Sequence, residues 1–222
     1  MIRRALFALV VLTAFSLTAL AVDKTGLNPI PPDAGSEPVV VLTTVKGDIY
    51  LRFFPDLAPE HVKNFLFHCE EGNYTDTYFH RVMPGFMIQG GDFNTKNDNH
   101  RDDGTGGYSY QGPGTNLKAE FSDRKHKRGI LSMARGGHSV DSAGSQFFLM
   151  HADYPSLNGK YSVFGEVIRG LDVVDAIVDV ETYGSNNHPT EDQTITGIEI
   201  LDWPTAKVEA YLYEQKTIEM KK

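Results

Sequence analysis

One stretch of the 222-residue chain, from Phe79 to Phe93, carries an unusual group of side chains that could do chemistry. Arg81 supplies a guanidinium and Gln89 a carboxamide, and two large apolar side chains lie between them. A turn at Pro84-Gly85 would fold two short strands together, and the period of two along each strand then sends these groups to defined faces. From pattern alone, a structural hairpin with one surface arginine explains the stretch equally well.

Other kinds of chemistry find little support in the residues. The chain has eight histidines, but no segment matches H-E-x-x-H, the P-loop or G-x-S-x-G. Its one cysteine, Cys69, excludes an intrachain disulfide and a cysteine-based zinc site. Asp98, His100, Asp102 and Asp103 resemble a calcium loop, but Asp103 stands where an EF-hand needs glycine. We interpret this run as a solvated loop and predict no metal.

Short strands must position these side chains. Val39–Val45 and Ile49–Phe53 flank a Lys-Gly-Asp turn and predict a hairpin. Pro59 suits the first turn of a helix whose apolar stripe runs to Cys69, and Leu171–Val178 predicts a second helix. Six further strands are predicted at 79–82, 86–89, 130–133, 146–150, 163–167 and 194–201. Many strands with two helices indicate an all-β sandwich or barrel.

Composition and charge exclude several classes of protein. The chain has 21 Lys and Arg against 29 Asp and Glu, a formal net charge of −8. This charge argues against a nucleic-acid partner and against binding to anionic lipid, both of which need a basic face. Hydrophobic residues make up 41% and charged residues 23%, which fits neither a disordered chain nor a multispan membrane protein.

The ends of the chain predict export and a single folded domain. Residues 1–21 combine two arginines, an apolar run and a small-residue Ala-Leu-Ala site, which is typical of a cleaved signal peptide. The alternative is an uncleaved membrane anchor, but the cleavage site disfavours it. We therefore expect that the mature protein is not stably inserted in a membrane. We expect a Pro/Gly-rich tether over 22–38, the folded domain over 39–203, and a polar extension over 204–222 that is either a packed helix or frayed. The compartment would be the periplasm, or the medium if the protein is secreted.

A family resemblance emerges when further blocks are added to the Phe79–Phe93 stretch. Over Val39–Leu201 the sequence resembles the cyclophilin-type peptidyl-prolyl cis-trans isomerases, and in particular the exported bacterial members of that family. The matching blocks occur in the same order in this chain as in the family. Five matching blocks in order make coincidence far less plausible than it is for any one motif. The other four blocks are Gly104–Gly107, Leu131–Ala134, Gly144–Phe148 and Leu157–Gly165.

The resemblance implies a fold and a site. The fold would be mainly β, a closed eight-stranded antiparallel β-barrel capped by two α-helices. Arg81 matches the catalytic arginine of the family, and the activity would need no cofactor. The substrate-binding positions comprise the proline-pocket walls Phe86, Met87, Phe148 and Leu157, the groove residues His80, Gln89 and Tyr161, and the peptide-contacting or flanking residues Ala134, Arg135 and Gln146.

Two residues depart from the family pattern. Ser156 takes the place of a tryptophan found in many members, and Tyr161 stands where animal members carry histidine. Both changes affect inhibitor binding and substrate preference more than the class of reaction, because Arg81 and the pocket walls are retained.

Three functions remain to be compared. The first is a monomeric isomerase that acts on X-Pro bonds in unfolded or loop segments and assists the folding of exported proteins. The second is a module that binds proline peptides with little or no turnover, and the third is a scaffold whose contacts are made by the tail from Thr205. Arg81 together with a complete pocket favours the enzyme.

Overall fold

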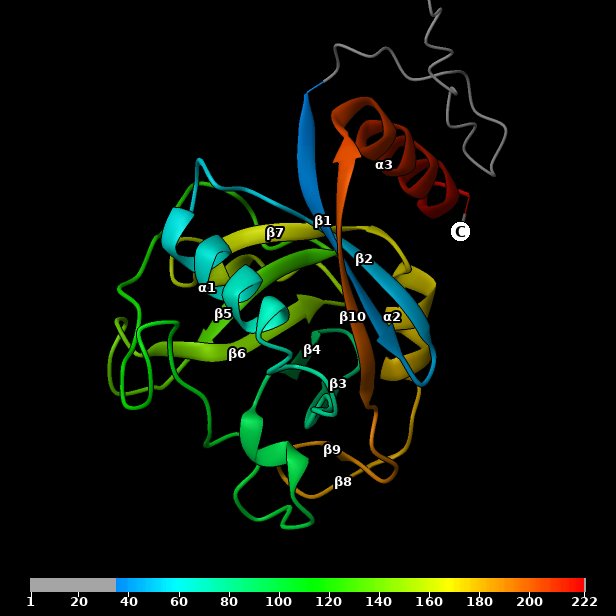
Figure 1. Cartoon of the computed structure of the whole chain (residues 1–222). Coiled ribbons are helices and arrows are strands. Elements are labelled where there is room, and N and C mark those ends of the chain that lie inside the picture. The colour runs from blue at the N-terminus through cyan, green and yellow to red at the C-terminus, as the bar shows by residue number, and fades with distance from the viewer. Residues whose placement is uncertain (1–34, 222) are drawn as a thin grey trace, which may run out of the picture. The chain divides into compact units, whose positions relative to one another are not determined.

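One antiparallel sheet of eight strands organises residues 35–221, the part of the chain that the computed structural model describes (Figure 1). Its strands lie in the spatial order β10-β1-β2-β7-β5-β6-β4-β3. Their bounds are β1 Ser36–Thr44, β2 Gly47–Phe53, β3 Arg81–Met83, β4 Met87–Gly90, β5 Ile130–Arg135, β6 Ala143–Met150, β7 Val163–Arg169 and β10 Ile195–Pro204.

Three α-helices and four short elements complete the described part of the fold (Figure 1). The helices are α1 Pro59–Glu70, α2 Leu171–Val178 and α3 Thr205–Glu219. The short elements are the 3₁₀ turns η1 Phe93–Lys96 and η2 Pro155–Leu157, and the paired two-residue strands β8 Thr182–Tyr183 and β9 His188–Pro189. No helix in residues 35–221 is both long and apolar enough to cross a membrane.

The first hairpin, β1 with β2, forms as predicted. Strand β1 pairs with β2 from Val39 opposite Arg52 to Thr44 opposite Gly47. The turn places Gly47 at a φ of +132°, a backbone conformation that favours glycine. Because β-branched side chains fill most of β1, the strand is buried over most of its length.

Helix α1 also matches its prediction. Pro59 lies in its first turn, where the missing backbone N–H costs nothing, and Glu60 favours the positive end of the helix dipole. Val62, Phe65 and Cys69 are buried on the stripe that faces the sheet. Burial also raises the pKa of the Cys69 thiol well above its usual range, in keeping with its interpretation as a small buried hydrophobe.

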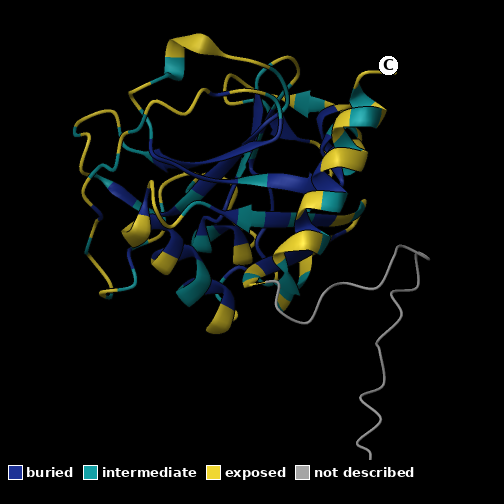
Figure 2. Cartoon of the chain, turned by 90° about the horizontal axis from the view of Figure 1, so that it is seen from above, coloured by how far each residue is buried: buried dark blue, intermediate teal, exposed yellow. Residues whose placement is uncertain are grey.

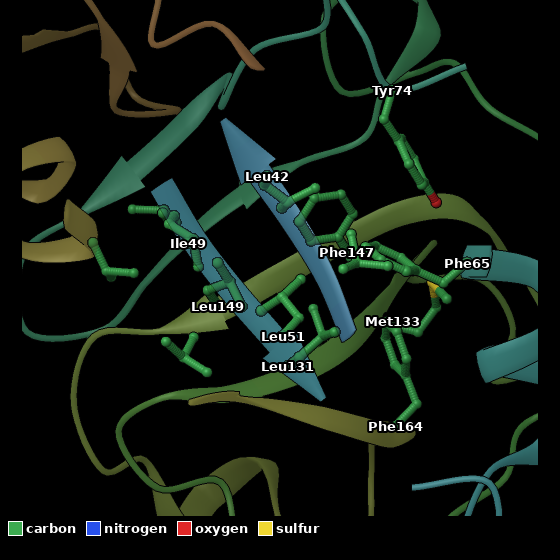
Figure 3. Packing of buried hydrophobic residues seen from close by; sticks show 14 of the residues in the cluster. Leu42, Ile49, Leu51, Phe65, Tyr74, Leu131, Met133, Phe147, Leu149 and Phe164 are labelled. Carbon is green, nitrogen blue, oxygen red and sulfur yellow. The ribbon is translucent and has the colours of Figure 1, made fainter. Parts of the chain in front are cut away.

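The main hydrophobic core lies where α1 and α2 cover the sheet. Phe65 of α1 is fully buried, and its ring centroid lies 5.1 Å from that of Tyr74 and 5.2 Å from that of Phe147 (Figure 3). Figure 2 shows that burial is concentrated in the strands, while loops and the outer faces of the helices are exposed. The sheet is therefore a rigid platform for side chains on its other face.

The prediction of a mainly β fold with a large antiparallel sheet is confirmed, but the described sheet is not a closed barrel, and a third helix, α3, is present beside the two predicted ones. Strands β10 and β3 are the two edges of the sheet. The segment just before β3 meets the start of β10 at the bridge of Tyr78 with Thr194, where Phe79 N–H donates to the Gln193 carbonyl at 3.1 Å, Ile195 N–H to that of Thr77 at 2.8 Å and Asp76 N–H to that of Ile195 at 2.9 Å, but this pairing does not continue along β3. The physical reason is that another segment occupies the free edge of β3. The backbone N–H of Val82 donates to the carbonyl of Asn187 at 2.9 Å, so the loop before β9 lies where a closing strand would pair.

The third helix is the C-terminal extension, and it packs rather than frays. Its side chains Val208, Tyr211 and Leu212 are buried in a cluster with Val39 of β1 and Ile168 of β7. At the other end, β1 begins at Ser36, so the last residues of the predicted tether belong to the sheet. The predicted signal peptide over 1–21 and the rest of the tether to residue 34 lie outside the described residues.

Candidate functional site

Three neighbouring strands place the predicted site residues in one row. Arg81 on β3 stands opposite Gln89 on β4, and Gln89 stands opposite Phe148 on β6. Side chains alternate along a strand, so Val82 and Ile88 enter the core while their neighbours face the opposite side. Two strand spacings separate the Cα atoms of Arg81 and Phe148, roughly 10 Å.

This row opens into a cavity of about 100 Å³. Nine of the eleven predicted site residues line it, and they come from five separate parts of the chain. They are Arg81, Phe86, Met87, Gln89, Ala134, Arg135, Phe148, Leu157 and Tyr161. His80 and Gln146 are absent from this lining and lie beside it.

The walls of the cavity belong to an apolar cluster that is separate from the main core. Met87 and Phe148 are nearly fully buried and form its base. The ring of Tyr161 meets that of Phe148 edge-on, with centroids 5.6 Å apart, and the ring of Phe86 packs 4.4 Å from that of Tyr154. These contacts fix the aromatic walls, because a ring held on one side by another ring has few free rotamers.

Supporting residues under and beside the walls were missed by sequence reasoning. Tyr154 packs against Phe86, and the His126 ring stacks on Phe148 with centroids 6.1 Å apart. His126 is held in turn by Asn158, whose side-chain oxygen accepts its backbone N–H at 2.7 Å. Such contacts connect distant segments, and no local pattern reports them. Ser156, the departure from the family pattern, is exposed on η2 and does not line the cavity.

The two arginines of the cavity differ in their partners. Arg135 lies over the Tyr161 ring at 4.7 Å and donates to the carbonyl oxygens of Lys160 and Gly136, each at 3.3 Å. Arg81 has neither an ion pair nor a side-chain hydrogen bond with any residue in 35–221. The donors of Arg81 are therefore free to bind a ligand in the cavity.

A chain of amide hydrogen bonds orients Gln89. Gln89 Nε2 donates to Gln146 Oε1 at 3.0 Å, and Gln146 Nε2 donates to the carbonyl of Gly106 at 2.8 Å. Because the nitrogen of Gln89 is engaged, its oxygen is left to accept a hydrogen bond from a ligand. Gln146 can reach across because the register of β6 shifts, with 144–146 standing opposite the single residue Ala134.

His80 lies beside the apolar cavity and is not part of its lining. It is buried beside Gly104 and lines a neighbouring cavity that it shares with Arg81 and Gln89. Burial lowers the pKa of His80 to about 4, so the ring is neutral at pH 7. Neither ring nitrogen has a hydrogen-bond partner within the described chain.

The chemistry available in the cavity follows from what lines it. The lining offers apolar walls for a small ring, a free guanidinium and a carboxamide oxygen. It contains no carboxylate, histidine, serine or cysteine among the described residues, so neither a nucleophile nor a general base is present there. Such a site can bind a ring and favour one geometry of its substrate through hydrogen bonds.

Comparisons with known proteins agree with this geometry. Residues 39–200 match the family described as cyclophilin type peptidyl-prolyl cis-trans isomerase/CLD. A Brucella abortus protein named "Probable peptidyl-prolyl cis-trans isomerase" is 41% identical over 169 residues, covering 74% of this chain and 84% of that protein. A peptidyl-prolyl cis-trans isomerase of Arabidopsis thaliana is 39% identical over 167 residues, covering 75% of this chain and 98% of its own length.

A solved structure is similar in fold as well as in sequence. The crystal structure of a Cryptosporidium parvum cyclophilin type peptidyl-prolyl cis-trans isomerase, in the presence of the dipeptide Ala-Pro, superposes with a TM-score of 0.66. It is 33% identical and covers 73% of this chain and 98% of that one.

Proposed function

This chain belongs to the cyclophilin-type peptidyl-prolyl cis-trans isomerase family and is an isomerase of that type, and from this premise we propose that its cavity rotates X-Pro bonds in unfolded or loop segments of exported proteins. The observation that carries the proposal is the free guanidinium of Arg81 at the edge of an apolar cavity. The Ala-Pro dipeptide of the Cryptosporidium structure supports a substrate of the same class.

Catalysis of this reaction requires that the resonance of the X-Pro amide be weakened, and no covalent bond has to be broken. The amide before proline has partial double-bond character, because the nitrogen lone pair is delocalised into the carbonyl, and its rotation barrier is about 20 kcal/mol. In the twisted state the lone pair is localised on a pyramidal nitrogen, which then accepts a hydrogen bond. A donor aimed at that nitrogen stabilises the twisted state more than the planar one, which is the condition for catalysis.

Arg81 is the donor that this mechanism assigns. Its guanidinium is always charged, and a charge-assisted hydrogen bond beside the apolar walls of the cavity is stronger than one in bulk water. Each tenfold gain in rate needs only about 1.4 kcal/mol of preference for the transition state. No covalent intermediate forms, in keeping with a lining that holds no nucleophile.

The other lining residues hold the substrate while the bond turns. Phe86, Met87, Phe148 and Leu157 clamp the proline ring, so that rotation is confined to the peptide on its N-terminal side. The Gln89 oxygen, held in place by Gln146, accepts a backbone N–H of the peptide. Fixing both ends of the substrate removes motions that do not lead to rotation.

A refolding experiment tests the proposed activity on protein substrates. Added in small amounts to an unfolded protein whose slow refolding phase is limited by proline isomerisation, the full chain is expected to accelerate that phase in proportion to its concentration. A slow phase whose rate is independent of the added chain would contradict the proposal.

Export is the second part of the proposal, and the sequence of residues 1–21 supports it. The Ala-Leu-Ala site ends at Ala21, so we expect the mature protein isolated from its host to begin at Val22. N-terminal sequencing or the intact mass of the mature protein decides this. Membrane-bound protein that still begins at Met1 would favour the uncleaved anchor instead.

A further inference from the structure

A cluster of metal-ligating side chains lies beside the isomerase cavity, in the loop that the sequence suggested was merely solvated. His100, Asp103 and His188 bring one ligand atom each within 4.8 Å of one another. His100 and Asp103 belong to the loop after η1, and His188 belongs to β9. These three line an open cavity of about 510 Å³ that also includes Arg81 and Gln89.

One oxygen of Asp103 is the centre of this cluster. Asp103 Oδ2 lies 2.8 Å from His188 Nε2, 3.3 Å from His100 Nδ1 and 2.6 Å from the hydroxyl of Tyr78. The side chain of Asp103 is only 4% exposed. Its other oxygen, Oδ1, is buried and has no hydrogen-bond partner in residues 35–221. The buried carboxylate of Asp103 therefore has three close neighbours at Oδ2 and no hydrogen-bond donor at Oδ1. Burying a charged group with an unpartnered oxygen is costly.

The contact of His188 with a backbone carbonyl fixes the tautomer of its ring. Its Nδ1 lies 2.8 Å from the backbone carbonyl of Pro189, which can only accept, so Nδ1 carries the hydrogen. In a neutral ring Nε2 then presents a lone pair, and that lone pair faces the carboxylate of Asp103 at 2.8 Å. Two lone pairs at this distance repel unless a positive charge, either a proton or a metal ion, lies between them.

A second observation points to a ligand in the same cavity. His80 lines it, is only 5% exposed and leaves both ring nitrogens without a partner in the described part of the chain. Burying a polar ring without a partner is costly. The cluster and its neighbour His80 therefore leave three buried polar atoms, Asp103 Oδ1 and both His80 ring nitrogens, without a partner in residues 35–221.

We propose that His100 Nδ1, Asp103 Oδ2 and His188 Nε2 bind a Zn²⁺ ion, with the fourth position open to water. Zinc commonly takes three such protein ligands and one water, whereas Mg²⁺ and Ca²⁺ prefer oxygen ligands alone. Bonds of about 2.0–2.1 Å in a tetrahedral site place ligand atoms about 3.3 Å apart. His100 Nδ1 already stands 3.3 Å from Asp103 Oδ2. His188 Nε2 lies 2.8 Å from the same oxygen, and all three ligand atoms lie within 4.8 Å of one another.

Tyr78 completes the site as a positioning residue. Its hydroxyl donates to Asp103 Oδ2 at 2.6 Å and also lies 2.7 Å from His100 Nδ1. It thus orients both groups, as hydrogen bonds to metal ligands commonly do, and His100 Nδ1 exchanges this contact for the ion when zinc binds. The bound ion would join the loop after η1 to β9, and so fix the loop that continues into Gly104–Gly107 at the rim of the isomerase cavity. This proposal concerns metal binding and does not depend on turnover of X-Pro bonds.

Calorimetric titration of the chelator-treated full chain with ZnCl₂ tests the site. Wild-type protein is expected to bind one equivalent, and the same titration with MgCl₂ to give no binding. His100→Ala and His188→Ala should each weaken Zn²⁺ binding by roughly tenfold or more, since each removes a direct ligand. The matched control is His138→Ala, which removes an exposed histidine outside the cluster and should leave binding unchanged.

Two further measurements keep the test decisive. The His100 side chain is 45% exposed, so His100→Ala is expected to fold even if the buried His188→Ala does not, and circular dichroism checks both. Co²⁺ in place of Zn²⁺ should give wild-type protein a visible absorption band that the two variants lack. The proposal would be overturned if the wild type did not bind Zn²⁺, or if the wild type and a folded His100→Ala variant bound it equally well. A proton would then be the positive charge between His188 and Asp103.

Discussion

Replacing Arg81 with alanine is expected to lower kcat/KM for an X-Pro peptide by about 10²–10³ while the protein stays folded. The change removes a donor that acts on the twisted amide, and loss of one such preorganised donor typically costs about 2.7–4 kcal/mol of transition-state stabilisation. Arg81 forms no ion pair with the described chain, so the native structure loses little. A protease-coupled assay measures the rate, and circular dichroism measures the fold.

Two further variants make this result specific to the guanidinium. Arg81→Lys should recover little activity, because an ammonium keeps the charge but not the planar set of donors. Arg169→Ala is the matched control, because Arg169 lies over the rings of Tyr50 and Tyr211, away from the cavity lining, and its loss should leave kcat/KM unchanged. Near-normal activity in folded Arg81→Ala would remove Arg81 from the mechanism.

Truncating Phe65 to alanine is expected to lower the free energy of unfolding by about 3–5 kcal/mol. Its ring is fully buried and lies between 5.1 and 5.6 Å, centroid to centroid, from four others, those of Phe53, Tyr74, Phe147 and Phe164. Removing it leaves a cavity that these rigid neighbours cannot easily fill (Figure 3). Urea unfolding measured by fluorescence or circular dichroism gives the difference.

The control for Phe65 is the same chemical change at the surface. Phe121 is 42% exposed, so Phe121→Ala should change the free energy of unfolding by only about 0.5 kcal/mol. If the two variants lose equal stability, α1 does not pack against the sheet as described. Activity of Phe65→Ala below its unfolding transition should stay near that of the wild type, because the cavity lining is formed by other residues.

Local signals predicted the eight strands of the main sheet and the helices α1 and α2, but not the short strands β8 and β9 or the two 3₁₀ turns. Leu171–Val178 is a helix within its predicted bounds because its apolar residues recur at helical spacing, and Pro59 marks the start of α1. The predicted strands differ from the observed ones by at most three residues at either end, and four of the ends coincide. Those ends depend on pairing partners, such as the shifted register of β6 at 144–146, that a single strand does not reveal.

The closure of the sheet could not be predicted in the same way. Closure depends on whether the edge of β3 meets β10 or another segment, and the loop at Asn187 takes that position. Packing of α3 has a similar origin, because Val208, Tyr211 and Leu212 find their partners on strands far away in sequence. Sequence patterns predict such faces but not the surface that covers them.

The candidate site was predicted largely by resemblance to a family, and the structure brings most of its residues together. His80 is an exception. It precedes Arg81 on an irregular segment just before β3, and its side chain lines the neighbouring cavity. The cluster of His100 and Asp103 with His188 could not be found from spacing, since 85 residues separate Asp103 from His188. Only the fold places them side by side.

The most direct test of the central claim separates turnover from binding. Exchange spectroscopy by NMR on an isotope-labelled Ala-Pro peptide, with the full chain at substoichiometric concentration, reports both at once. If the enzyme acts through Arg81, the wild-type chain should produce exchange between the cis and trans signals. The Arg81→Ala variant should still bind the peptide and shift its signals, but most of the exchange should be lost. If the wild-type chain shifts the peptide signals but leaves the rate of cis–trans exchange unchanged, the cavity only binds proline peptides and the account is wrong.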